Sequence, residues 1–116
     1  MGSLRSLRGP EERDVLVQCA GVEGAFALDD AYVAGRFVAE LRVWLAEWST
    51  TDAATAAAVL AGAFPSSADA LGASSSAANL RAAGLAEDLR ACARESAFDV
   101  VPRVEDVDAG VALITI

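Results

Sequence analysis

The segment that most constrains the fold of this chain is residues 29–48, DDAYVAGRFVAELRVWLAEW. At 100° per residue, its apolar side chains fall on one arc, which comprises Val33, Ala34, Phe37, Val38, Leu41, Trp44, Leu45 and Trp48. Glycine, alanine and charged residues occupy the opposite side. This periodicity predicts an amphipathic helix whose arc is buried and supplies most of the core. Asp29 or Asp30 is expected to cap the first free amides of that helix.

Two shorter elements are predicted before this helix. Pro10, the two glutamates after it and Gly21 together predict a helix over residues 10–20, with Cys19 facing inward. The β-branched run VLVQC within the same residues also permits a strand. Residues 22–28 are expected to form a strand or an extended entry into the long helix.

Two helices are predicted after it, separated by a loop. The first covers residues 53–64, capped by Thr51 or Asp52 and stopped by a proline, and the second runs over residues 76–96. Between them, residues 66–76 (SSADALGASSS) are rich in serine and are expected to be a mobile loop.

The C-terminal residues change to a β-rich composition. Residues 98–104 and 110–116 predict a hairpin joined by an acidic turn, with Pro102 placing the first strand at an edge. Both faces of the last strand are apolar, so it should be covered on both sides or paired with another chain. We therefore expect residues 10–116 to form a single α+β domain, after a disordered tail at residues 1–9. Three to four helices would pack on a small, mainly antiparallel sheet that includes the hairpin.

Charge and composition exclude several classes of function. The net charge is −8 and the pI is about 4.3, which argues against nucleic-acid binding and suits a protein partner with a basic surface. The chain is lysine-free, which either codon bias or selection would explain. No apolar run is long enough to span a membrane and no secretory signal is evident, so an intracellular, cytoplasmic protein is expected. The start, MGSLRS, fits a myristoylation pattern, so acylation of Gly2 would change the membrane prediction.

The side chains that usually carry catalysis are scarce. There is no histidine, and the adjacent carboxylates lie at predicted helix starts, on solvent faces or in turns, where acids are common without catalytic function. The two cysteines, Cys19 and Cys92, cannot complete a tetrahedral metal site and are expected to be small core residues. Residues 105–108 (EDVD) lack the spacing of a calcium-binding loop. No catalytic residue, cofactor or metal is therefore predicted.

Binding remains the favoured function. Tyr32 and Val43 are predicted on the back of the long helix, Leu80 outside the core on a later helix, and Trp48 at a helix end, so these four are the candidate partner-binding residues. They predict a non-enzymatic module, such as an inhibitor, an immunity-type protein or an assembly adaptor. A homodimer joined through the C-terminal strand is also compatible. The alternative is a small thiol-dependent enzyme that uses Cys19 or Cys92.

One segment resembles a known family. Residues 19–35, CAGVEGAFALDDAYVAG, resemble the helix-to-strand entry of roadblock/longin-type domains. This resemblance implies a dimeric platform for a small GTPase. It requires residues 31–38 to be a strand, where the periodicity predicts a helix, so no family is assigned from it.

Overall fold

The computed structural model describes residues 14–45 and 47–116. The chain divides into two compact units, and each is described by itself. The larger unit is Leu16–Glu95, and the described part of the smaller unit comprises residues 14–15 and 96–116. The single domain over residues 10–116 stays a prediction, and the tail predicted at residues 1–9 lies outside the described residues.

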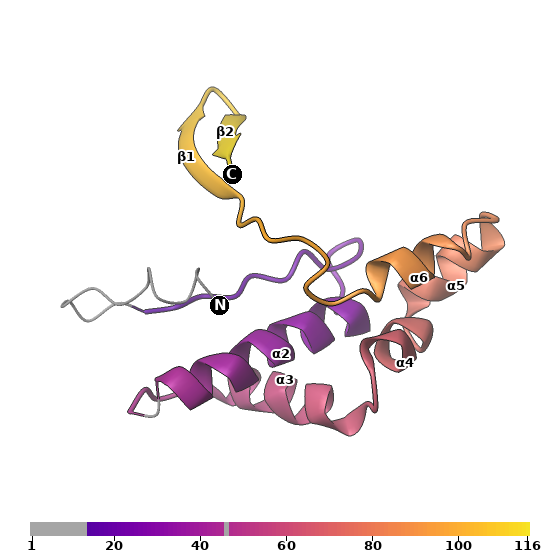
Figure 1. The fold of residues 1–116 in the computed structure, drawn as a ribbon, viewed down its shortest axis with the longest axis horizontal. Coiled ribbons are helices and arrows are strands. Elements are labelled where there is room, and N and C mark those ends of the chain that lie inside the picture. The colour runs from indigo at the N-terminus through magenta and orange to yellow at the C-terminus, as the bar shows by residue number, and fades with distance from the viewer. Residues whose placement is uncertain (1–13, 46) are drawn as a thin grey trace. The chain divides into compact units, whose positions relative to one another are not determined.

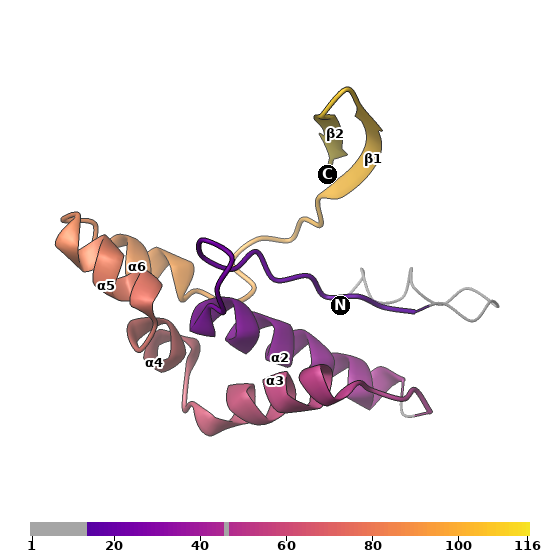
Figure 2. The ribbon, with the colours of Figure 1, turned by 180° about the vertical axis from the view of Figure 1, so that it is seen from behind.

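The larger unit is built on two long helices, α2 (Leu28–Trp44) and α3 (Asp52–Ala63), which lie side by side (Figures 1 and 2). Both helices were predicted, and the Thr51 side chain caps α3 by accepting a hydrogen bond from the Ala54 amide at 3.2 Å. Helix α2 ends at Trp44 because Leu45 leaves the helical conformation, with φ −126° and ψ 55°. The predicted continuation to residue 48 is therefore wrong, and Trp48 lies beyond the helix.

The buried side of α2 differs from the predicted arc. Ala34 and Val38 are buried as expected, but Val33 and Phe37 are 46% and 54% exposed. The reason is Gly35, which faces α3 so closely that a Cβ there would overlap the Ala57 carbonyl oxygen. Close approach of the two helices thus depends on small residues. The residues of α2 that are buried are Ala31, Tyr32, Ala34, Gly35 and Val38.

The core of this unit is small. Its buried cluster joins α2, α3 and the next helix through Tyr32, Ala61 and Ala70, with Leu60, Phe64 and Leu71 packed against it. The rings of Tyr32 and Phe64 meet edge to face, with centroids 6.2 Å apart and an interplanar angle of 87°. Among the described residues, the buried apolar side chains are mostly alanines, so each contributes little buried area.

The serine-rich segment is mostly helical, so the prediction of a loop over residues 66–76 is wrong. It contains α4 (Ser67–Gly72) and the start of α5 (Ser75–Ala82). Two of its serines are helix caps: Ser66 accepts from the Asp69 amide at 3.2 Å, and Ser74 accepts from the Ala77 amide at 3.1 Å. Serine at these positions begins helices by satisfying their free amides.

The helix predicted over residues 76–96 is broken in two. After α5, Gly84 has φ +77°, a left-handed conformation that ends a helix and that glycine adopts readily. The chain resumes as the short helix α6 (Asp88–Cys92), and Cys92 is exposed there instead of belonging to the core.

The segment before α2 contains neither a described helix nor a strand. Residues 14–20 have no regular structure, so the predicted helix over residues 10–20 is absent from this part of the chain. Residues 10–13 of that prediction lie outside the described residues. Short helices are marginal without a packing surface, and Leu16 is 83% exposed. Cys19 is exposed as well, which corrects its predicted inward orientation. Residues 22–25 form a tight turn closed by a single bridge between Val22 and Ala25.

The described part of the smaller unit ends in an antiparallel hairpin of β1 (Arg103–Asp108) and β2 (Val111–Thr115). Its turn is Ala109-Gly110, both with positive φ, which is the favoured geometry for a two-residue hairpin turn. The first strand is therefore not at residues 98–104 as predicted, because it begins at Arg103, after Pro102. The acidic residues Glu105, Asp106 and Asp108 belong to β1 and not to the turn, and the register shifts between Val104 and Asp106. The structure confirms the α+β class with a C-terminal hairpin. None of the helices in the described residues is both long and apolar enough to cross a membrane.

Candidate functional site

The first turn of α2 carries two adjacent carboxylates with different surroundings. Asp30 Oδ2 accepts a hydrogen bond from the Gly21 amide at 2.6 Å. This bond spans nine residues and ties the segment before α2 to the start of the helix. Asp30 therefore has a structural partner, and it is not the helix cap: the N-cap position is Ala27, which makes no side-chain cap bond.

Asp29 is the carboxylate without such a partner. Its Oδ1 atom is buried and makes no hydrogen bond within the described residues. Buried polar atoms in folded proteins almost always have a partner, and an exception calls for an explanation such as a catalytic role or a bound ion. Acidic groups in the first turn of a helix are also favoured by its dipole, which explains why a carboxylate is tolerated at this position. Asp29 is thus the acidic group at this end of α2 whose buried oxygen has no partner within the described residues.

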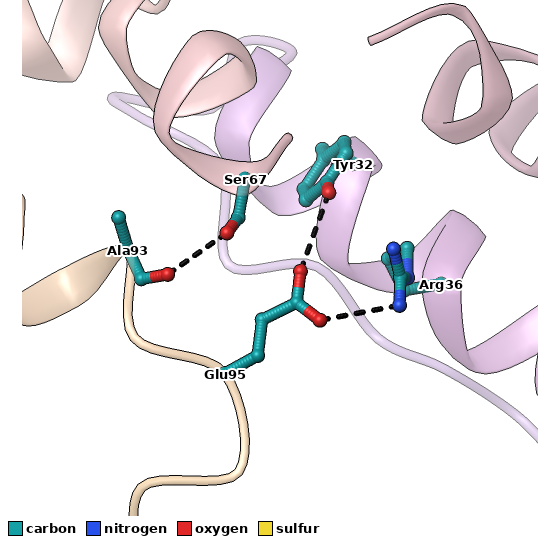
Figure 3. A network of polar contacts seen from close by, with 5 residues as sticks. All are labelled: Tyr32, Arg36, Ser67, Ala93 and Glu95. Carbon is teal, nitrogen blue, oxygen red and sulfur yellow. Dashed lines mark hydrogen bonds and ion pairs between the residues drawn. The ribbon is translucent and has the colours of Figure 1, made fainter. Parts of the chain in front are cut away.

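A second group of polar contacts lies further along α2 (Figure 3). Glu95 accepts from the Arg36 guanidinium at 3.2 Å through one carboxylate oxygen and from the Tyr32 hydroxyl at 3.5 Å through the other. The Arg36 and Glu95 side chains are about half exposed, so water weakens this ion pair. Ser67 Oγ donates to the Ala93 carbonyl at 2.8 Å, which fixes the start of α4 to the segment that carries Glu95. The network therefore holds residues 93–95 against α2 and α4.

Most of the polar side chains described above already have hydrogen-bond partners within the chain, which limits what else they can bind. Of the described arginines, Arg36, Arg42, Arg81 and Arg90 donate hydrogen bonds to oxygens of the chain itself, and Arg103 is also engaged within the chain. These contacts leave fewer cationic donors for an anionic ligand. The described residues also contain no group of three or more acidic or cysteine side chains that could hold a metal ion. Asp29 and Asp30 could supply at most part of a cation site.

The four predicted partner-binding residues do not lie together as a group. Tyr32 is only 2% exposed and belongs to the core cluster, so its predicted place outside the core is wrong. Val43 is 78% exposed on α2, Trp48 is 40% exposed beyond its end, and Leu80 is partly buried on α5. A partner-binding role for these residues stays a prediction.

Sequence reasoning missed both polar features of this unit. Asp29 was interpreted as a capping acid, and nothing in its spacing distinguishes it from Asp30. Arg36 and Glu95 are 59 residues apart, so no local pattern could pair them. The resemblance to roadblock/longin-type domains fails on the fold, because residues 31–38 lie inside helix α2 and do not form the strand that it requires.

Comparison with known proteins gives a consistent result. The profile of the 2-phosphosulpholactate phosphatase family matches residues 4–107. A probable 2-phosphosulfolactate phosphatase from Thermus thermophilus is 37% identical over 89 residues. These residues cover 77% of this chain but only 37% of the relative.

These matches overturn the functional prediction. They indicate an enzyme family of phosphatases, so the prediction of a non-enzymatic inhibitor, immunity-type protein or adaptor is wrong. The platform for a small GTPase and the thiol-dependent enzyme using Cys19 or Cys92 are replaced by the same finding. Sequence reasoning went wrong because it took the absence of histidine as evidence against catalysis, whereas carboxylates can also serve phosphoryl transfer.

Proposed function

The chain belongs to the 2-phosphosulpholactate phosphatase family, and from this membership we propose that it forms part of a hydrolase acting on a phosphorylated 2-hydroxy acid. The observation that carries the proposal is the family match over residues 4–107, which contains all five helices of the described residues. The substrate class comes from the name of the relative, of which the chain covers 37%. The reaction would transfer the phosphoryl group to water, breaking the phosphorus–oxygen ester bond and releasing phosphate and the hydroxy acid.

Asp29 is the residue that we assign to this chemistry. Its Oδ1 atom is buried and has no partner in the described part of the chain, whereas the neighbouring Asp30 is engaged by the Gly21 amide. A carboxylate oxygen with a free lone pair can accept a hydrogen bond from the attacking water and orient it toward phosphorus. Phosphoryl transfer depends mainly on such positioning and on charge stabilisation.

The test is a comparison of two neighbouring substitutions. Release of inorganic phosphate from 2-phosphosulfolactate would be measured for the 116-residue chain alone and together with the part of the Thermus relative outside the aligned residues. Asp29→Asn should lower kcat by about 100-fold or more, the usual contribution of a positioned acid–base group. Asp30→Asn is the matched control: its amide oxygen can still accept from Gly21, so activity should change by less than about threefold.

Two results would contradict the proposal at different points. If Asp29→Asn retains full activity, Asp29 has no part in the chemistry, although the family function stands. If no phosphate is released in either arrangement, the proposed activity itself is wrong for this chain.

A further inference from the structure

The outward side of α2 carries a row of large apolar side chains. Val33, Phe37 and Trp44 lie within about 40° of one another around the helix axis, at 3.6 residues per turn. They are 46%, 54% and 40% exposed. Gly35, which contacts α3, lies about 160° away from Val33. The outer row of α2, as we call these three residues, therefore points away from the packed side of the helix.

This row needs an explanation because its three members share one side of the helix. Single exposed apolar residues are normal on protein surfaces, but an apolar row along one helix marks a contact surface. A helix that is apolar on two opposite sides is typical of one that is covered on both. Glu40 lies on the same side of α2 as the row. A partner that covers this side must therefore offer apolar groups to the row and one hydrogen-bond donor to the Glu40 carboxylate. Aromatic residues at the centre of such a surface are usual interface anchors.

The likeness to the phosphatase points to one occupant. The aligned residues make up 77% of this chain but only 37% of the relative, so the larger part of that protein lies outside the alignment. The hairpin of the smaller unit is also apolar and uncovered: Val104, Val107, Val111, Leu113, Ile114 and Ile116 are all more than half exposed. Two-stranded hairpins are marginal by themselves and usually need additional packing. Both elements thus have the exposed apolar surface that further parts of a larger fold would cover.

We propose that the outer row of α2 is the docking surface for the portion of the phosphatase fold that lies outside the aligned residues. This inference depends on the family membership used for the proposed function, but it concerns binding and not activity. The occupant is a polypeptide of this family that presents an apolar surface with a donor opposite Glu40. Docking would cover Phe37 and Trp44 and bring further residues to the unit that carries Asp29.

The test measures association directly. The 116-residue chain, with an affinity tag, would be co-expressed with the portion of the Thermus relative outside its 89 aligned residues, and the eluted complex would be analysed by size-exclusion chromatography and titration. The expected result is a complex of one copy of each. Phe37→Glu should weaken binding about 30-fold or more, the loss typical of an interface anchor. Val59→Glu is the matched control, because Val59 is 69% exposed on α3 and lies outside the row, so its affinity should stay within about threefold.

Trp44 provides a second, independent readout. In a Trp48→Phe background it is the remaining tryptophan, and its emission should shift to shorter wavelength when the partner covers it. Circular dichroism of Phe37→Glu alone verifies that the helices are intact. Failure of the unsubstituted chain to form the complex would overturn the proposal, as would equal affinity of the Phe37→Glu and Val59→Glu chains. A chain that forms a dimer by itself through Phe37 would show a second copy to be the occupant instead. Because every readout is physical binding, a complex that forms without phosphatase activity would refute the proposed function and leave this inference standing.

Discussion

The two sides of α2 differ in the size of their side chains and in what covers them. The side toward α3 is formed mainly by small residues, among them Ala31 and Gly35, and is buried. The opposite side carries Val33, Phe37 and Trp44, and each is 40% or more exposed. The large apolar residues Val33, Phe37 and Trp44 therefore do not decide which side of α2 packs. Small residues do, because they let two helix backbones approach closely and gain many contacts along their length.

Gly35→Ala tests the packed side and should have the largest effect on stability. A Cβ at residue 35 would overlap the carbonyl of Ala57 and lie 2.8 Å from the Ala61 Cβ, so the two helices would have to separate. We expect a loss of about 2–3 kcal/mol in the free energy of unfolding, as is usual for overpacking. Urea denaturation followed by circular dichroism would measure it.

Gly62→Ala is the control for helix propensity. Nothing lies within 4 Å of the position that its Cβ would take, and the residue is inside α3. Alanine should therefore stabilise the chain by up to about 1 kcal/mol through propensity alone. If Gly35→Ala proves as stable as Gly62→Ala, close packing at Gly35 is not what sets the orientation of α2.

The contrast between the sides also explains how far the sequence could predict this fold. Periodicity predicts the helix that the structure has as α2, although not its end at Trp44, and Gly110 at the hairpin turn predicts the reversal, because both signals are local. The buried side could not be predicted in the same way. The hydrophobic arc shows which side chains are apolar, but it contains no information about how closely a second helix can approach Gly35. The serine caps were misinterpreted because a cap and a loop use the same residues, and only the partner amide of Ser66 or Ser74 distinguishes them.

The candidate site was less predictable than the fold. Asp29 and Asp30 are adjacent and chemically identical, and they differ only in that the Gly21 amide reaches one of them. That difference arises from a turn whose geometry depends on positive φ at Glu23 and Gly24. The ion pair of Arg36 and Glu95 depends in turn on the path of the chain through α4, α5 and α6. Such long-range placement is not encoded in any single spacing.

Substituting alanine for two consecutive residues of α2 compares its two sides directly, with smaller expected changes in the free energy of unfolding than Gly35→Ala. Val38 is 8% exposed and Phe37 is 54% exposed, although they are consecutive on α2. Val38→Ala removes two buried methyl groups and should cost about 1.5 kcal/mol, whereas Phe37→Ala should change the free energy of unfolding of the chain alone by no more than about 0.5 kcal/mol. Thermal or urea unfolding of the two variants in parallel measures both. If Phe37→Ala instead lowers the free energy of unfolding by as much as Val38→Ala does, the ring of Phe37 is already covered within this chain. The docking surface proposed for the outer row of α2 would then be ruled out.

The ion pair at the edge between the two sides should give the smallest effect. Arg36 and Glu95 are half exposed and 3.2 Å apart, so their coupling energy in a double-mutant cycle with Arg36→Gln and Glu95→Gln should be about 0.5 kcal/mol. It should fall further in roughly 0.5 M salt, because the charges are within reach of counterions. The pair of Arg90 and Glu87 has the same 3.2 Å separation, but its side chains are more than 80% exposed on one short helix segment, so its coupling should be close to zero. Equal coupling energies for the two pairs would show that the ion pair between Arg36 and Glu95 contributes no more than an exposed surface contact. The segment that carries Glu95 would then be held by other contacts.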